Sequence, residues 1–412
     1  MTNSRRRAKE VERGQVCDPV STKPLADIRV LDLTRLLPGP MCSLHLADMG
    51  ADVIKIEDPG PGDYSRHRRS DEKASLAPVF DQINRNKRSL KLDLKQPEGV
   101  QTFMDLVAES HVLIEGFRPG VMARLGIDFA RVRARNPAIV FCAISGYGQD
   151  GPLRDMAGHD INYCGYAGVL HQCGARDGPP SPPNFQIADL LGGTLSAVMG
   201  ILAALLDAQR SGKGRYVDVA MTDCTLAHSV VPFARVNTEG EARPRGRDAL
   251  CGGLPCYGVY ETSDGGYMAL GALEAKFWQA FCEAVARPDL AEHHMVSGDT
   301  ADRVRAEVAA IFKSSSRDDW TKRLVDVDCC ASPVLSPAEA RRHPQLVERG
   351  MFVNADDADI ESEQLAFPLH MSDFEFSVER LAPAHGENSC EILAEIGYGD
   401  ERIRELENKG VI

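Results

Sequence analysis

The chain has 412 residues, of which 43% are hydrophobic and 26% are charged. This composition is typical of a folded protein and excludes a disordered, collagen-like or coiled-coil chain as the main interpretation. At roughly 150 residues per domain, the length predicts two or three domains, or one large domain with an insertion. Sixty acidic against 47 basic side chains give a net charge of −13. We therefore expect no binding to nucleic acid or to an anionic membrane surface.

The twelve cysteines contain no Cys-x-x-Cys pair and no Cys/His set at zinc spacing. We therefore expect free thiols, a reducing compartment and no metal. Residues 1–23 contain an arginine run but no apolar segment, which favours a flexible tail and a cytoplasmic location. The uncharged stretch 190–206 is short for a membrane span and is interrupted by glycines, so it predicts a buried helix.

Strand and helix patterns alternate over the first 150 residues. Strands are expected at 28–33, 51–57, 112–115 and 138–144, with a turn at 38–40, a helix from there to about residue 49, and another over 98–109. This alternation predicts an α/β fold with a Rossmann-like parallel sheet. The first turn holds Pro38-Gly39-Pro40 where a dinucleotide-binding domain has a glycine-rich loop. Use of NAD or FAD is therefore not expected.

Residues 66–95 carry nine basic and four acidic side chains, a local excess of five positive charges. The run fits a solvated face and a polyphosphate ligand about equally well, since Arg and Lys pair with phosphate oxygens.

The second half of the chain has a different pattern. Residues 238–247 resemble a linker, and a hairpin is expected from 257–260 and 267–270 around the turn 263–266. Helices are expected at 274–286 and 301–312 and, near the end, at 388–406. These elements predict a second, smaller α+β domain.

Three side chains stand where chemistry is plausible. His159 lies in a glycine-rich loop after a strand, Asp189 precedes an apolar helix, and Glu274 begins another helix. Each has an ordinary structural alternative: a loop hydrogen bond for His159, an N-cap for Asp189, and a carboxylate favoured by the helix dipole for Glu274. The sequence has no Gly-x-Ser-x-Gly, P-loop or His-Glu-x-x-His motif, so hydrolase and metalloenzyme functions are not indicated.

Several short motifs together resemble those of one family. They are Val30–Thr34 with Leu37–Pro40, Leu46–Ala51, Asn86–Lys95, Glu115–Gly120, Ala157–Tyr163, Asp189–Gly193, Gly271–Phe277, Ala331–Leu335, His343–Gln345 and His385–Glu387. The chain resembles the class III CoA-transferases (CaiB/BaiF type), a family that also contains racemases, from about residue 24 to residue 412.

The resemblance implies a domain plan. A large Rossmann-like CoA-binding domain would span 24–237, an inserted small domain 248–354, and a C-terminal return to the large domain 364–412. Two chains would interlock as a homodimer, with each site between the large domain of one chain and the small domain of the other.

The resemblance also implies a reaction. Transferases use an Asp nucleophile at the position of Asp189, whereas racemases pair that Asp with a His in a Gly-His-Asp motif, here Gly158-His159-Asp160. Glu274 also lies in a racemase-like motif. We therefore expect racemisation of 2-methylacyl-CoA thioesters, without a cofactor because CoA is part of the substrate. A CoA-transferase using Asp189 is the alternative, and a CoA-binding protein without turnover is a third possibility.

Racemisation requires bases on opposite faces of the α-carbon, which His159 and Asp189 would supply. Glu274 would hold or polarise His159, and backbone N–H groups at the start of the Asp189 helix would stabilise the enolate oxygen.

The resemblance assigns CoA contacts to several residues. The adenosine part would meet Leu92, Asp93, Leu94 and Lys95, phosphates would meet Lys95 and Arg118, and the pantetheine end would meet Ala157, Gly158, Asp160, Ile161 and Asn162. Many relatives have an arginine for a CoA phosphate where this chain has Asp58. We expect Arg66, Arg68 or Arg69 to replace it.

Overall fold

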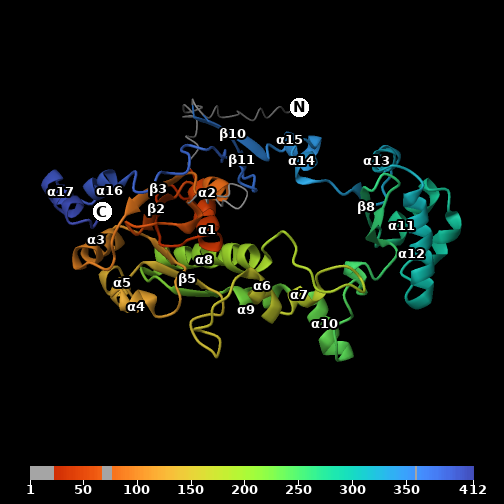
Figure 1. Ribbon diagram of the computed structural model, residues 1–412, viewed down its shortest axis with the longest axis horizontal. Coiled ribbons are helices and arrows are strands. Elements are labelled where there is room, and N and C mark those ends of the chain that lie inside the picture. Colours follow the sequence, from red (N-terminus) through yellow and green to blue (C-terminus); the bar gives the residue numbers. More distant parts are fainter. Residues whose placement is uncertain (1–22, 67–76, 358–359) are drawn as a thin grey trace, which may run out of the picture.

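The computed structural model describes residues 23–66, 77–357 and 360–412, so nearly all of the predicted tail lies outside the described residues. Its centre is a sheet of six parallel strands in the order β3-β2-β1-β4-β5-β6 (Figure 1). The strands are β1 (Arg29–Asp32), β2 (Asp52–Glu57), β3 (Lys87–Lys91), β4 (Val112–Glu115), β5 (Val140–Ser145) and β6 (Tyr216–Ala220). This sheet confirms the predicted parallel α/β architecture. The order reverses between β1 and β4, where sheets of this kind hold ligands beyond the strands' carboxyl ends.

Successive strand residues point to opposite sides of the sheet, and helices pack against both faces. Val30 belongs to a core shared with α1 (Pro38–Asp48) and α8 (Ser196–Ser211). Leu31, its neighbour, belongs to a second core on the other face. The helices of that face are α3 (Pro97–Ala108), α5 (Phe129–Arg135), α16 (Ser389–Glu395) and α17 (Asp400–Asn408).

Shorter elements complete the large body. They are a 3-10 turn (Tyr64–Arg66), α2 (Ala77–Ile83), α4 (Val121–Arg124), α6 (Asp160–Tyr166), α7 (Val169–Gln172), the π-helix η3 (Ala188–Leu195), α9 (Met221–His228) and α10 (Val230–Glu239).

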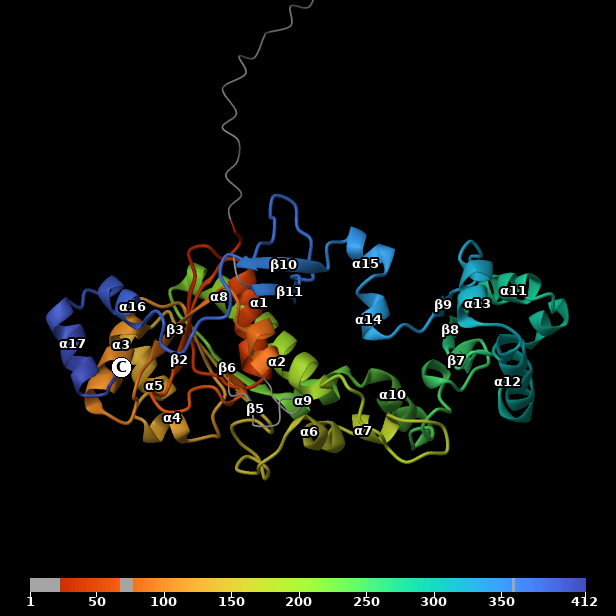
Figure 2. The ribbon, with the colours of Figure 1, turned by 45° about the horizontal axis from the view of Figure 1, so that its top comes forward.

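A smaller body has its own hydrophobic core, which includes Trp278, Phe281, Phe312 and Trp320. It contains the antiparallel sheet β7 (Tyr257–Glu261), β8 (Tyr267–Gly271) and β9 (Ala331–Pro333), the helices α11 (Ala275–Ala284), α12 (Gly298–Lys313) and α13 (Arg317–Leu324), and 3-10 turns at Ala249–Cys251 and Pro288–His293. The β7–β8 pairing confirms the predicted hairpin. Figures 1 and 2 place this body at the opposite end of the molecule from α16 and α17.

The chain returns to the main sheet through α14 (Pro337–Ala340), α15 (Pro344–Glu348) and the hairpin of β10 (Phe352–Asp357) and β11 (Ile360–Leu365). The predicted final helix is in fact the two helices α16 and α17, separated around Gly397 and Gly399.

Two local predictions were wrong. The expected turn at Pro38–Pro40 is the first turn of α1, since proline is well tolerated where a helix has no partner for the N–H group. Strand β3 was not predicted, because its Lys87 and Arg88 were attributed to a solvated or phosphate-binding face. Both side chains are buried instead.

The predicted buried helix at 190–206 is only partly buried. Together, η3 and α8 are long and apolar enough to cross a membrane by length and composition, and 44% of their most apolar window is buried. Ile201 and Leu205 face the core, whereas Leu195, Met199 and Leu206 are exposed.

Candidate active site

A cavity of about 520 Å³ opens beyond the carboxyl ends of β1, β4 and β5. The loops that follow these strands form one wall, through Thr34–Leu36, Gly116–Pro119 and Ser145–Tyr147. His159, Asn162 and Asp189 line the same cavity. The fold thus brings two of the three candidate catalytic residues to the point where the strand order reverses.

Asp189 lies in the first turn of the π-helix η3. This helix packs closely on its neighbours: a Cβ atom on Gly192 would lie 2.5 Å from the Met221 carbonyl oxygen in α9. The glycine therefore permits the contact that presents Asp189 to the cavity.

The expected alternative role of Asp189 as an N-cap is wrong, because Asp160 performs it. Asp160 Oδ1 accepts hydrogen bonds from the N–H groups of Ala188 at 2.7 Å and Asp189 at 3.1 Å. A carboxylate at this position satisfies helix N–H groups that otherwise have no partner. One side chain of α6 thereby holds the start of the helix that carries Asp189.

The same arrangement changes the acidity of Asp189. Burial, with a smaller contribution from the nearby negative charge of Asp160, raises its pKa to about 7. Both effects disfavour the carboxylate form. Near neutral pH, Asp189 therefore holds a proton far more readily than an ordinary aspartate does.

His159 is exposed and immediately precedes α6. Its backbone N–H donates to Asn162 Oδ1 at 3.1 Å, which fixes the start of that helix. Because His159 and Asp160 are consecutive, the residue that holds the start of η3 is the direct chain neighbour of His159.

The expected enolate donors at the start of η3 are not free. The N–H groups of Ala188 and Asp189 bind Asp160, and the Leu190 N–H binds the Gln186 carbonyl at 2.9 Å. The prediction that these amides stabilise an enolate is therefore wrong for the first three of them.

Glu274 does not line this cavity within the same chain. It is exposed and sits immediately before α11 in the smaller body, with no side-chain capping bond. Figures 1 and 2 show α11 far from α6 and α1.

The predicted pantetheine contacts fall into two groups. Ala157, Gly158 and Asn162 line the cavity, as does Arg118. Asp160 instead caps η3, and the exposed Ile161 lies outside the lining.

The predicted adenosine segment lies at a second cavity of about 420 Å³. Leu94 and Lys95 line it, together with Arg124 and Arg131, which sequence analysis missed. Leu92 is buried in the core, and Asp93 accepts the Lys95 N–H at 3.0 Å. The sequence signal for Arg124 was its place one helical turn beyond the Glu115–Gly120 motif.

The basic run 66–95 serves mainly the interior. Four of its six described cations pair with carboxylates of the main sheet and α1: Arg66 with Glu57, Arg85 with Asp48, Lys87 with Asp32, and Arg88 with Asp52. Neither expected interpretation, a solvated face or a phosphate site, holds for these four residues.

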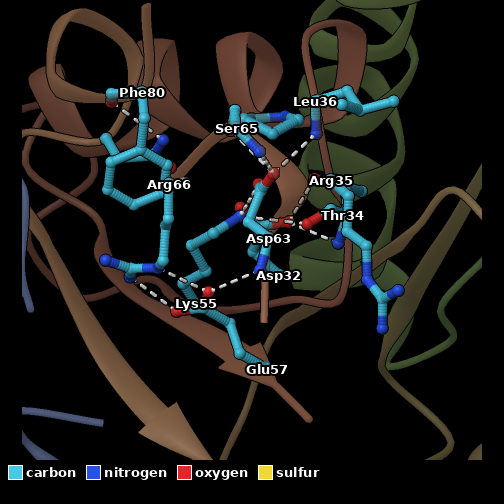
Figure 3. A network of polar contacts seen from close by, with 12 residues as sticks. Asp32, Thr34, Arg35, Leu36, Lys55, Glu57, Asp63, Ser65, Arg66 and Phe80 are labelled. Carbon is cyan, nitrogen blue, oxygen red and sulfur yellow. Dashed lines mark hydrogen bonds and ion pairs between the residues drawn. The ribbon is translucent and has the colours of Figure 1, made fainter. Parts of the chain in front are cut away.

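Arg66 is thus not free to replace the missing phosphate arginine, and Arg68 and Arg69 lie outside the described residues. Figure 3 shows the Arg66 side chain directed to Glu57, with Nη2 2.6 Å from Oε1. Asp58 accepts a hydrogen bond from Arg35 Nη2 at 2.8 Å, and Arg35 lines the main cavity.

Figure 3 shows a network of polar contacts that includes Thr34, Arg35 and Leu36, three residues of the cavity wall. Lys55 Nζ lies 2.9 Å from Asp63 Oδ2, and Lys87 Nζ lies 3.5 Å from Asp32 Oδ2. Asp32 also accepts the Thr34 N–H at 2.8 Å. The network therefore holds the loop that follows β1.

Glu115, at the end of β4, is like Asp189 a carboxyl that pairs with no cation in the part of the chain that the structure describes. It flanks Ala143 of β5, opposite Asp218 of β6. Burial, with a smaller contribution from Asp218, raises the pKa of Glu115 to about 7, against the opposing effect of the Phe117 N–H that donates to its carboxylate.

The family model of CoA-transferase family III matches residues 25–389. The chain belongs to this family. It is 34% identical to alpha-methylacyl-CoA racemase from Homo sapiens over 388 residues, 94% of this chain and 97% of that protein. It is also 34% identical to succinate–glutarate CoA-transferase from Agrobacterium fabrum, over 92% of this chain and 97% of the relative. Sequence identity therefore does not separate the two reactions.

The family assignment agrees with the fold. A crystal structure of a CaiB/BaiF family protein from Brucella suis has a TM-score of 0.78 and 28% identity, covering 91% of this chain and 99% of that one.

Proposed function

We propose that this family III enzyme racemises 2-methylacyl-CoA thioesters by two-base proton transfer. The observation that carries the proposal is the presence of His159 and Asp189 in one cavity, with the pKa of Asp189 raised to about 7. A two-base racemase needs one base free and one protonated at the same pH. The surroundings of Asp189 suit it to both states.

In the proposed step, one base removes the α-proton and the C–H electron pair forms a carbon–carbon double bond. The carbonyl electron pair moves to the thioester oxygen, which gives an enolate. The other base, protonated, then delivers its proton to the opposite face of the α-carbon. The two bases have then exchanged protonation states, and the return reaction or proton exchange with water restores them.

The test uses one enantiomer of a 2-methylacyl-CoA in deuterated buffer with no free acid added. We expect deuterium at the α-carbon together with loss of chirality. Both should fall by at least about 10²-fold in His159→Ala and in Asp189→Asn. His171→Ala and Asp155→Asn, nearby and outside the cavity lining, serve as matched controls. Exchange that survives in either catalytic-site variant contradicts the two-base assignment.

The second cavity suits the CoA phosphates, because Lys95, Arg124 and Arg131 bring three cations to one hollow. We expect Lys95→Ala combined with Arg124→Ala to weaken CoA binding by about 10- to 100-fold, and more at low salt. Lys213→Ala, on an exposed turn, is the control. Unchanged CoA affinity would exclude this cavity as the phosphate site.

A second copy of the chain would complete the site. Glu274 is distant from His159 in one chain, and α8 and α10 expose apolar side chains: Leu195 before α8, Met199, Leu206, Val230, Val231, Phe233 and Val236. Such a patch marks an association surface. We propose the interlocked homodimer, in which Glu274 of one chain supports His159 of the other.

Two inactive variants can test this assignment. Mixed dimers of His159→Ala and Glu274→Ala chains, co-expressed with different tags, would contain one intact site each. Activity in the doubly purified dimer, absent from either parent, is expected. Continued inactivity would place Glu274 outside the partner's site.

The CoA-transferase remains a second candidate, since Asp189 faces the cavity and a transferase relative is equally similar. In that reaction an Asp189 oxygen bonds to the acyl carbon while the carbon–sulfur bond breaks and CoA leaves as a thiolate. CoA transfer that requires a free carboxylic acid, without α-proton exchange, would favour this candidate.

A further inference from the structure

Two arginine side chains from different segments of the chain meet at Gly120, the residue before α4. A Cβ atom on Gly120 would lie 3.9 Å from Arg124 Nη1 and 3.9 Å from Arg154 Nη2. Apart from the adjacent residues in the chain, nothing else in the described structure lies within 4 Å of that point. Gly120 has a φ of +83°, a conformation that favours glycine, so the space between the two guanidinium groups stays open.

The two positive charges have no counter-charge. Both side chains are exposed, and no hydrogen bond or ion pair joins either guanidinium group to another described residue. Glu115 and Asp128 line a third cavity beside Gly120, but they accept the backbone N–H groups of Phe117 at 2.7 Å and Arg131 at 3.1 Å. Like charges held at one point repel each other, and an anion between them removes that repulsion.

This pair of arginines lies at the junction of the cavities described above. Arg154 lines the main cavity, and Arg124 lines the second cavity. Arg118 lines the main cavity and also the third cavity, of about 380 Å³, to which Gly120 belongs. The pair therefore connects the site of the acyl group with the site proposed for the CoA phosphates.

The charges of CoA are arranged in a matching way. A diphosphate joins the pantetheine arm to adenosine, and a separate phosphate lies on the 3′-oxygen of the ribose. Lys95 and Arg131 line the second cavity and not the main one. Arg131 donates from Nη1 to the Gly126 carbonyl at 2.7 Å and keeps its other N–H groups. Because the diphosphate is closer to the thioester along the CoA molecule, it fits the arginine pair that reaches the main cavity.

We propose that Arg124 and Arg154 clamp the CoA diphosphate at Gly120, while Lys95 and Arg131 bind the ribose 3′-phosphate. This inference rests on the proposed reaction of a CoA thioester and makes Arg154 a binding residue for it. Guanidinium groups suit the role because their planar N–H pairs match two phosphate oxygens at once. The clamp thus holds the start of the pantetheine arm beside the main cavity.

Three substrates separate the two phosphate sites: 2-methylacyl thioesters of CoA, of 3′-dephospho-CoA and of pantetheine. Arg154→Ala should raise KM about 10- to 100-fold with the first two, the loss expected for a charged hydrogen bond. It should leave KM with the pantetheine thioester unchanged. Lys95→Ala should raise KM with the CoA thioester alone. In both variants kcat should stay the same, because the phosphates are bound equally before and during the reaction.

A control and a conservative variant complete the test. Arg133→Ala removes the same charge from α5 outside these cavities and should leave all three KM values unchanged. Arg154→Lys keeps the charge without the planar N–H pair and should recover part of the loss. If the effect of Arg154→Ala persists with the pantetheine thioester, Arg154 meets the acyl group and the clamp is overturned.

Calorimetric binding of free CoA and 3′-dephospho-CoA separates this inference from the proposed reaction. Arg154→Ala should weaken both ligands, and Lys95→Ala only CoA. If the wild type shows no α-proton exchange, the racemase is overturned, and these affinities still decide the role of Arg154. If Arg154→Ala binds both ligands as the wild type does, the clamp is overturned and the racemase stands.

Discussion

The fold contains two groups of buried carboxyls, and their pKa values are shifted in opposite directions. Burial alone would raise the pKa of Asp32 and Asp63, yet Lys55 and Lys87 lower it, to about 2 for Asp63. Among the described residues no cation pairs with Asp189 or Glu115, and burial is the main cause that raises the pKa of each to about 7. Ion pairs beneath the wall keep charge fixed, whereas unpaired carboxyls at the cavity and beside it can gain or lose a proton. The comparison therefore separates the carboxyls that support the fold from those that can take part in proton transfer.

The largest expected effect comes from breaking the paired group. Lys87→Met leaves Asp32 buried with one of its two cations missing. Loss of one partner of a buried pair costs about 3–5 kcal/mol. Denaturant unfolding should show that loss, and Lys213→Met on the surface should show none. An unchanged unfolding midpoint would mean that the network does not support the wall.

The substitution Asp160→Asn tests the raised pKa of Asp189, in the second group of carboxyls. The amide oxygen can still accept from the N–H groups of Ala188 and Asp189, but the negative charge beside Asp189 is gone. The pKa of Asp189 should fall, so the corresponding limb of the pH–rate profile for α-proton exchange should move to lower pH. We expect kcat at neutral pH to fall by about 10-fold. A profile that does not move would show that burial alone sets the acidity of Asp189.

Asp189→Asn should change how stability depends on pH. A pKa raised from 3.8 to about 7 means that the folded protein binds this proton more tightly than the unfolded chain does. Wild-type stability is therefore lost as pH rises from about 4 to about 7. The variant avoids that loss, and we expect it to be more stable than the wild type at pH 8 by about 1–2 kcal/mol, allowing for partial exposure. Melting curves at pH 5 and pH 8 test this, and equal differences at both pH values would contradict it.

Glu115→Gln should have a similar but smaller effect, because Glu115 keeps the Phe117 N–H bond that favours its charged form. We expect a gain of about 1 kcal/mol at pH 8 over the wild type, and little at pH 5. Glu109→Gln, an exposed change at the end of α3, is the control. Destabilisation at both pH values would mean that the Glu115 carboxylate has a structural role.

The sequence allowed most of the sheet to be predicted. Strands β1, β2, β4 and β5 are apolar runs, which buried parallel strands require. Strand β3 was not predicted because lysine and arginine are typical surface residues. No local sequence pattern indicates that Lys87 and Arg88 lie beside Asp32 and Asp52.

The residues of the candidate site were predictable from residue type and family resemblance, but the hydrogen bonds among them were not. The motifs indicated His159 and Asp189. That Asp160 would occupy the amides at the start of η3 depends on how α6 meets that helix, a long-range contact without sequence spacing.

The half-exposed surface of η3 and α8 has a consequence for how the protein matures. Only 44% of the most apolar window of η3 and α8 is buried, so a single folded chain exposes an apolar surface to water. In the proposed two-chain assembly, the last folding step is a collision between chains, and its rate rises with concentration. In dilute solution, chains would spend longer with this apolar surface exposed, and aggregation would compete with dimerisation. Refolding yield should therefore depend on protein concentration.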